Sequence, residues 1–260
     1  PSVLSDRAIK WSLDQLGTLG SGNHFIELQV VDTVYQPDSA DAFGLWEGQI
    51  MVLIHSGSRG FGHQICDDFL KKMTSGAVQK ELSTNLPDRQ LACAYITSDA
   101  GRKYLAAMAC AANYAWANRQ ILMHRTREIL AHTLSLPEQG RDMRLVYDVC
   151  HNIAKKETHS IEGRRRVTCV HRKGATRALP AGHPSLPSRY MKAGQPVLIP
   201  GDMGTESYVM AGAPGAMQKS FGSCCHGAGR LMSRTQAVKN AKGRSIRGEL
   251  ETAGIVAFSH

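Results

Sequence analysis

The most reactive-looking segment of the sequence places a histidine between two cysteines and a glycine turn, in the letters CCHGAGR at 224–230. A cysteine nucleophile would need an aligned base and an oxyanion donor, and the adjacency of Cys225 and His226 does not align their side chains. A metal site would need further ligands, because no CxxC or HxxxH pair completes it. His226 could instead attack a nucleoside triphosphate and form a phosphoramidate. Phosphate binding by the turn and ordinary packing stay open as alternatives.

Three other histidines stand beside strand-like runs: His24 in GNHF, His55 in IHSG and His151 after LVYDVC. A single histidine at a strand edge is usually structural, but three flanked by Gly, Asn or Ser favour a metal cluster. Their spacing matches neither HExxH nor a zinc finger, so such ligands would converge from distant segments. Three histidine ligands leave open the coordination positions that a catalytic metal needs.

Several glycine-rich turns could bind phosphate without belonging to the common nucleotide-binding motifs. GSRGFG at 57–62 is not GxGxxG, and the dipeptide Gly-Lys never occurs, which excludes a P-loop. Backbone N–H groups of such turns can still cradle phosphate oxygens. Arg59, Lys173 and Arg234 each lie in a motif of this kind and could clamp phosphates, the alternative for each being a surface cation.

The charge of the chain is positive and unevenly distributed. The formal net charge is +9; 141–193 holds twelve Lys or Arg against four Asp or Glu, and 219–247 holds seven and no acid. This distribution predicts a phosphate-rich ligand, with a solvated basic face as the alternative. Seven scattered cysteines without a CxxC pair predict a reducing compartment, the cytoplasm or, in a eukaryote, the nucleus. We expect no signal peptide and no membrane-spanning segment.

The elements that must position these residues indicate an α+β protein, and we expect a single domain over 1–260 with mixed or antiparallel sheets and surrounding helices. Apolar runs predict strands at 24–31, 48–57, 143–149, 165–172 and 195–200. Amphipathic patterns predict helices at 62–73 and 98–134, with Ser98 or Asp99 as the cap of the second. The segment 178–190 is a Pro-rich loop. The polar motifs fall at strand ends, where rigid scaffolds place functional groups.

Six motifs together resemble those of RtcB-type RNA ligases, in the order found in that family. The resemblance runs from about Gln15 to Arg234 and rests on GTLGSGNHFIE, HSGSRG, CHNIAKKE, HRKGATRA, IPGDMGTESYV and SFGSCCHGAGRLMSR. It implies a ligase that joins RNA ends bearing a 2′,3′-cyclic phosphate or a 3′-phosphate to 5′-hydroxyl ends, in tRNA splicing or RNA repair. The substrates would be tRNA halves or broken RNA and GTP, with one or two Mn²⁺ ions, and Zn²⁺ could bind the same site. The resemblance does not identify an activating protein partner.

The resemblance also assigns roles to individual residues. It implies that His226 is guanylylated and that His24, His55 and His151 bind the metal. It places RNA phosphates on Arg59, Lys173 and Arg234. The implied nucleotide-binding residues are Asn23, Glu27, Asn152, Pro200, Asp202, Met203, Ser207, Gly227, Ala228 and Gly229. Among them, Glu27 would accept hydrogen bonds from guanine.

The sequence departs from the family pattern in three places. It contains neither the Asp and Cys of a DIGCG-like motif nor the C-terminal lysine that contacts the nucleotide, so we expect it to be truncated at both ends with reduced metal affinity. Asp202 stands where many members have Ser. Two alternatives follow: a non-catalytic, RNA-binding relative, and a metal-dependent phosphoesterase acting on cyclic phosphates.

Overall fold

The computed structural model describes residues 3–75, 78, 88, 91–137, 143–227 and 231–258. The chain divides into two compact units, Pro1–Val34 with Trp46–Asp148 and Tyr35–Leu45 with Val149–His260. Both units combine helices with antiparallel strand pairs, which confirms the predicted α+β class. That they form a single domain stays a prediction.

The first unit carries a strand pair and the long helices. Its elements are α1 (Asp6–Gln15), β1 (Phe25–Val30), β2 (Ile50–His55), α3 (Arg59–Met73) and α5 (Asp99–Thr133). The second unit is built from short elements: α2 (Pro37–Phe43), β3 (Asn152–Ile161), β4 (Arg164–Lys173), β5 (Ala175–Arg177), η3 (Ser188–Tyr190), β6 (Pro196–Ile199), β7 (Tyr208–Ala211), α6 (Pro214–Ser220), β8 (Ser223–Cys225), α7 (Arg234–Asn240) and α8 (Ile246–Thr252).

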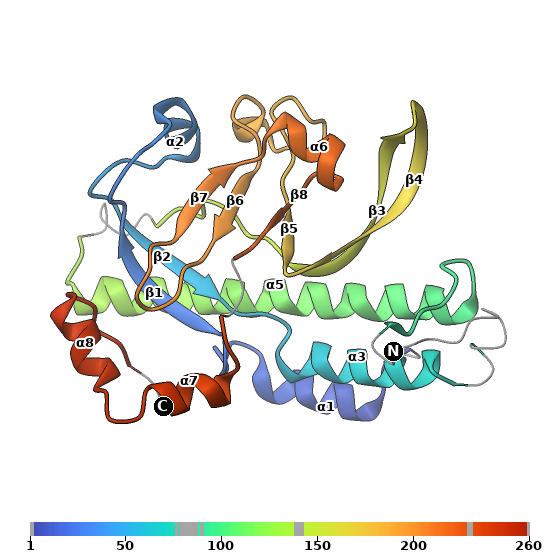
Figure 1. The fold of residues 1–260 in the computed structure, drawn as a ribbon, viewed down its shortest axis with the longest axis horizontal. Helices are drawn as coiled ribbons and strands as arrows, with labels where there is room; N and C mark the ends of the chain where they lie inside the picture. Colours follow the sequence, from blue (N-terminus) through green and yellow to red (C-terminus); the bar gives the residue numbers. More distant parts are fainter. Residues whose placement is uncertain are drawn as a thin grey trace. The chain divides into compact units, whose positions relative to one another are not determined.

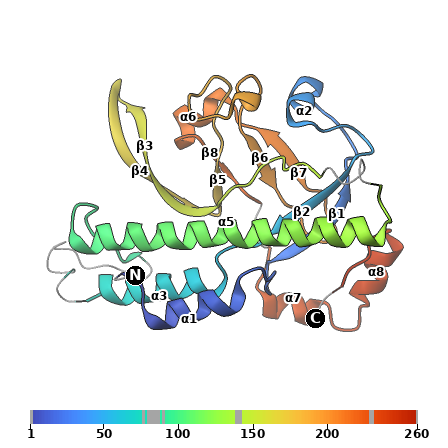
Figure 2. The same ribbon diagram turned by 180° about the vertical axis from the view of Figure 1, so that it is seen from behind.

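The helices of the first unit enclose its apolar core. In Figure 1 and, from behind, in Figure 2, α1 and α3 both run along the N-terminal half of α5, and α3 contacts each of the other two. Aromatic rings join α3 to α5, with Phe69 and Tyr104 centroids 5.3 Å apart. As predicted, Ser98 caps α5, and its hydroxyl accepts a hydrogen bond from the Gly101 N–H at 3.1 Å. The buried core residues are Ala8, Phe61, Ile65, Phe69, Met73 and Ala107.

A buried asparagine on α5 holds the two loops that carry motifs of the first unit. Asn118 is fully buried, and its Oδ1 accepts from the N–H groups of Gly17 at 2.6 Å and Thr18 at 3.1 Å. Its Nδ2 lies within donating distance of Ser56 Oγ at 3.1 Å and the Gly57 carbonyl at 3.2 Å. One amide therefore links the loop before β1 to the loop after β2.

The predicted strand at 143–149 is wrong, because these residues form no strand in the structure. Side chains of α5 contact this segment. The Arg127 guanidinium donates two hydrogen bonds to the Met143 carbonyl. Arg119 Nε donates to Asp148 Oδ1 at 2.8 Å and its Nη1 donates to the Ser56 carbonyl at 3.1 Å. β propensity depends on the surroundings of a segment, so an apolar, β-branched composition does not by itself establish a strand.

The second unit consists of antiparallel strand pairs joined by turns, β3 with β4, β5 with β8, and β6 with β7 (Figure 1). The strands predicted at 165–172 and 195–200 are confirmed as β4 and β6, and those at 24–31 and 48–57 as β1 and β2. The Pro-rich segment is confirmed as a loop that ends in η3. There Tyr190, almost fully buried, meets Phe43 of α2 edge to face at 5.6 Å. No helix in the described ranges is long and apolar enough to cross a membrane.

Replacing Asn118 tests the proposed link between the two loops. We expect Asn118→Ala to lower the free energy of unfolding by about 2–3 kcal/mol, because it leaves buried N–H and C=O groups without partners. The measurement is urea denaturation of this variant beside Asn113→Ala, which removes the same side chain from an exposed position of α5. Equal losses in the two variants would contradict a role for the Asn118 bonds.

Candidate active-site histidines and phosphate-binding cations

The first unit brings His24 and His55 together at one end of the β1–β2 pair. The strands are paired with Phe25 opposite His55, so His24, which precedes Phe25 in the chain, lies just outside the paired region. The ring centroids of the two histidines are 6.1 Å apart, and Phe25 packs edge to face against His55 at 5.2 Å. Two of the three predicted metal-binding histidines are therefore neighbours.

The surroundings of His24 favour a neutral imidazole. Burial lowers its pKa, and the positive charge of Arg59 lowers it further, against the hydrogen bond to the Leu19 carbonyl. Nδ1 lies 3.0 Å from that carbonyl oxygen. If Nδ1–H donates there, the lone pair is on Nε2, which is the arrangement found in metal-binding histidines held by a second hydrogen bond.

Arg59 lies beside His24, held by an unusual backbone conformation. It is the first residue of α3 and has φ +54°, a left-handed value that is rare outside glycine. Its Nη1 lies 3.1 Å from His24 Nδ1, and its Nε donates to Thr18 Oγ1 at 3.3 Å. Backbone strain of this kind concentrates at functional sites, which supports a role for this guanidinium beyond surface solvation.

Glu27 and Asn23, two of the predicted nucleotide-binding residues, lie on β1 and in the turn before it. The half-buried Glu27 lies on β1, two residues beyond Phe25 and therefore on the same side of the strand. Burial raises the pKa of its carboxyl group, and the hydrogen bond from Gln29 Nε2 to Oε2 at 2.8 Å opposes that change. Asn23 is exposed in the turn before β1.

The second unit stacks His151 on His226, with ring centroids 4.1 Å apart and planes inclined by 29°. Strand pairing brings together these residues, which are far apart in the sequence. His226 directly follows β8, and its N–H donates to the Gly174 carbonyl at 3.2 Å. Ala175, the residue after Gly174, pairs with Cys225 and donates its N–H to the His151 carbonyl at 3.4 Å. The start of β5 thus holds both histidines.

Burial shifts the pKa values of His226 and Cys224 in opposite directions. Burial lowers the pKa of His226, so its ring keeps the lone pair that a nucleophile needs. Burial raises the pKa of the Cys224 thiol, and the neighbouring Cys225 raises it further. A thiol held in its protonated form is a poor nucleophile. These shifts favour His226 over Cys224 as a nucleophile.

Asn152 and Lys173 lie where β3 and β4 begin and end. They face each other across the pair, and both are exposed. The N–H of Gly174 donates to Asn152 Oδ1 at 3.3 Å, at a glycine with φ +64° that turns the chain from β4 into β5. Lys173 is therefore separated from the start of β5 by a single residue.

A buried arginine that the sequence analysis did not identify anchors the strand leading to His226. The Arg172 guanidinium, only 2% exposed, donates to both carboxylate oxygens of Glu157 at 2.8 Å. Its Nε donates to Ser223 Oγ and its Nη2 to the Phe221 carbonyl, both at 2.9 Å. These bonds join β4 to the beginning of β8. The only signal in the sequence is an arginine on the inward side of an alternating strand.

The loop between β6 and β7 contains Pro200, Asp202, Met203 and Ser207. Asp202 Oδ1 accepts from the Gly204 N–H at 2.9 Å and the Thr205 hydroxyl at 3.1 Å, and Ser207 Oγ accepts from the Gly201 N–H. Asp202 thus organises its own loop, and Met203 is exposed. A Cβ built on Gly227 would lie 3.9 Å from the Pro200 carbonyl oxygen, so the turn after His226 approaches this loop.

The remaining predicted residues have little structural description. Ala228 and Gly229 lie outside the described residues. Arg234 is the first residue of α7, and its side chain lies outside the described part of the chain. The functional roles of all these residues stay predictions.

Comparison with known proteins gives a consistent result. The profile of a family described as "tRNA-splicing ligase RtcB" matches residues 1–260. The chain is 52% identical over 258 residues to tRNA-splicing ligase RtcB of Methanocaldococcus jannaschii, covering 99% of this chain and 26% of that protein. It is 50% identical to the protein of the same name from Methanococcus maripaludis, covering 100% of this chain and 54% of the relative. Identity to RNA-splicing ligase RtcB of Mycobacterium bovis is 51%, over 97% and 56% of the two chains. The chain thus spans between about a quarter and just over half of these relatives.

Replacing Gly20 tests how closely Arg59 and His24 are held. A Cβ at Gly20 would overlap the Arg59 guanidinium and come 2.5 Å from His24 Nδ1, whereas one at Gly48, also with positive φ, would meet nothing. Both Gly→Ala variants should lose about 1–2 kcal/mol from backbone strain. Only Gly20→Ala should raise the pKa of His24, measured by NMR titration, because it moves the arginine charge away. An unchanged His24 titration in Gly20→Ala would count against the contact.

Replacing Glu157 tests the anchor of β8. Burial alone would raise the pKa of Glu157, but the hydrogen bonds from Arg172 and His159 outweigh it and leave the pKa lowered. The resulting stability is present above the unfolded-state pKa of about 4.3 and is lost as the pH falls through the folded-state value. We expect Glu157→Gln to cost about 3 kcal/mol at neutral pH and progressively less in acid, measured by denaturation across pH. The exposed Glu162→Gln is the control. A gap that does not change with pH would refute the ion-pair explanation.

Proposed function

We propose that this chain, which belongs to the tRNA-splicing ligase RtcB family, provides the nucleotidyl-transfer histidine of an RNA ligase. The ligase joins RNA ends bearing a 3′-phosphate or a 2′,3′-cyclic phosphate to 5′-hydroxyl ends, in tRNA splicing or RNA repair. The observation that carries this proposal is the half-buried His226, which follows β8, stacks on His151 and has a lowered pKa. A neutral ring nitrogen in this position suits nucleophilic attack on phosphorus.

The proposed reaction balances in three transfers. A ring nitrogen of His226 attacks the α-phosphorus of GTP, and pyrophosphate leaves with the electrons of the broken P–O bond. An oxygen of the RNA 3′-phosphate then takes the GMP group from the histidine. Finally, the 5′-hydroxyl oxygen attacks the activated 3′-phosphorus, loses its proton and displaces GMP. A 2′,3′-cyclic phosphate must first be opened by water to give the 3′-phosphate.

Mn²⁺ is the proposed metal, as one or two ions bound by His24, His55 and His151. The chemistry of the donors fits, because imidazole binds Mn²⁺ or Zn²⁺ only when neutral and His24 is held in that state. When bound, the metal would offset negative charge on the phosphates. The contribution of the chain itself is to keep the rings neutral and to orient them through bonds such as that between His24 and the Leu19 carbonyl.

The neighbouring polar residues suit the remaining groups of the substrates. Glu27 would accept hydrogen bonds from the N1–H and exocyclic amine of guanine, a preference that would select GTP over ATP. Ser207 and the loop shaped by Asp202 would contact the same nucleotide. Arg59 and Lys173 would hold RNA phosphates, Arg59 through its planar guanidinium and Lys173 as an exposed point charge. Arg234 would act alongside them.

A guanylylation assay tests the proposed function. The full-length protein, incubated with α-labelled GTP and Mn²⁺, should form a covalent adduct that is acid-labile and base-stable, as expected of a phosphoramidate. We expect His226→Ala to abolish the label and His63→Ala, at an exposed histidine of α3, to retain it. A label that survives in His226→Ala would refute the assignment. RNA binding without any adduct would support the non-catalytic alternative, and cyclic-phosphate opening without GTP would support the phosphoesterase.

A further inference from the structure

We propose that the outward face of the β3–β4 hairpin is a track for the RNA backbone, which leads away from the end of the hairpin that carries Asn152 and Lys173. The track is defined by Lys156, Arg165 and Lys173. The inference rests on the proposed function, because RNA is the anionic polymer that this protein would have to hold. It extends the predicted phosphate contacts from one lysine to a surface that runs the length of two strands.

The register of the hairpin places these cations on one face. In an antiparallel pair, directly opposed residues point to the same side, and every second residue along a strand does so too. Asn152 pairs with Lys173, Lys156 with Cys169, and Ser160 with Arg165, each separated by an even number of residues. Lys156, Arg165 and Lys173 are all exposed. They therefore share a single solvent-facing surface.

The opposite face is fixed inward by the buried ion pair. Glu157 and Arg172 lie on that face, and Arg172 is bonded to Ser223 and Phe221 near β8. His159 is also buried there, with its Nε2 3.0 Å from Glu157 Oε2. Because these bonds hold the hairpin in one orientation, the basic face cannot turn away from solvent without breaking them.

The composition of the outward face matches a nucleic-acid backbone. Among the described residues of β3 and β4, the acidic side chain, Glu157, is on the inward face, so the outward cations have no carboxylate beside them on the strands. The other outward side chains include the hydroxyls of Thr158 and Ser160, which can donate to phosphate. Neither strand contains Phe, Tyr or Trp for bases to stack on, and the aromatic side chain on the outward face is the exposed imidazole of His171. The face should therefore bind phosphates with little sequence preference.

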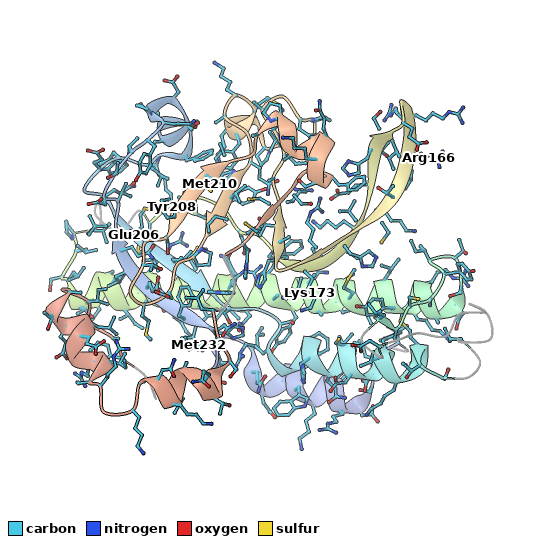
Figure 3. The ribbon with its side chains drawn as sticks, viewed as in Figure 1. Arg166, Lys173, Glu206, Tyr208, Met210 and Met232 are labelled. Carbon is cyan, nitrogen blue, oxygen red and sulfur yellow. The ribbon has the colours of Figure 1, made fainter. Side chains whose placement is uncertain are left out.

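The dimensions and direction of the hairpin also fit such a track. Ten residues of β3 extend about 30 Å, whereas a nucleic-acid strand advances about 3.4 Å per nucleotide along a B-form axis. The face can thus follow several nucleotides. Figure 3 shows Arg166 toward the tip of the hairpin and Lys173 at its other end. Lys173 and Asn152 adjoin His151 and the turn into β5, so the track starts where the RNA 3′-phosphate would react.

A protein partner fits this surface less well. Protein interfaces are usually organised around aromatic, arginine or apolar anchors in desolvated pockets. The large apolar side chain on the outward face is Val167, which is 73% exposed and stands alone between Thr158 and the basic residues. Regularly spaced cations with a single large apolar side chain favour an elongated polyanion.

Salt-dependent binding of the full-length protein to a 3′-phosphorylated, single-stranded RNA of about 15 nucleotides tests the track. Lys156→Ala combined with Arg165→Ala should reduce the slope of log K against log salt by about 1.4, because each lost phosphate contact contributes about 0.7. By the same relation, Kd should rise about 25-fold at 0.1 M salt. The charge-conserving combination of Lys156→Arg with Arg165→Lys should bind RNA as the unmodified protein does, since it keeps both charges.

The matched control removes two neighbouring charges from the other face of the same hairpin. Arg164 and Arg166 are exposed and alternate with Arg165, so they point away from the proposed track. Arg164→Ala combined with Arg166→Ala should change Kd less than about threefold. Equal weakening by the two double variants would overturn the proposal, as would an unchanged slope in the outward variant. Guanylylation of His226 should be normal in both double variants. If the unmodified protein itself were not guanylylated, that result would contradict the proposed function but leave the RNA-binding comparison valid.

Discussion

The arrangement of the first unit depends on a single buried amide. Asn118 is completely enclosed, and its oxygen and nitrogen both bond to backbone or hydroxyl groups of two separate loops. An unmade bond in this interior would cost more than a made one contributes, so the loops are strongly held in this one arrangement. The first of these loops ends at His24 and the second leads into α3 at Arg59, and the ring and guanidinium nitrogens of these two residues approach to 3.1 Å. A residue without a predicted chemical role thus helps to position two residues that have one.

In the second unit, a buried ion pair holds separate segments together as the buried amide does in the first. Arg172 is buried but makes two bonds to Glu157 and two to the segment that begins β8. A buried ion pair contributes little net stability when it replaces apolar packing, yet breaking it is costly. Its value here lies in specifying geometry: β8 has one position relative to β4, and the stacked His226 and His151 follow from it.

The sequence predicted elements whose signals are local and missed those that depend on pairing. The length and capping of α5 and the bounded apolar runs of β1, β2, β4 and β6 were sufficient to find them. In contrast, β3 contains three charged residues and pairs with β4, whereas 143–149 has the composition of a strand but forms none. In the candidate site, the motifs predicted roles for the histidines. They could not show that His24 contacts Arg59 or that Arg172 anchors β8, since both contacts join segments 35 or more residues apart.

The two kinds of side chain that the proposed chemistry needs require opposite environments, and the fold supplies both. A nucleophilic or metal-binding histidine must be neutral, and partial burial achieves this for His24 and His226. Cations that attract RNA must stay exposed to act at long range. Alternation along β4 meets this need, because it turns Arg172 inward, where its charge is neutralised by Glu157, and Lys173 outward. The alternation of a single strand thus separates a buried, structural cation from one exposed to solvent.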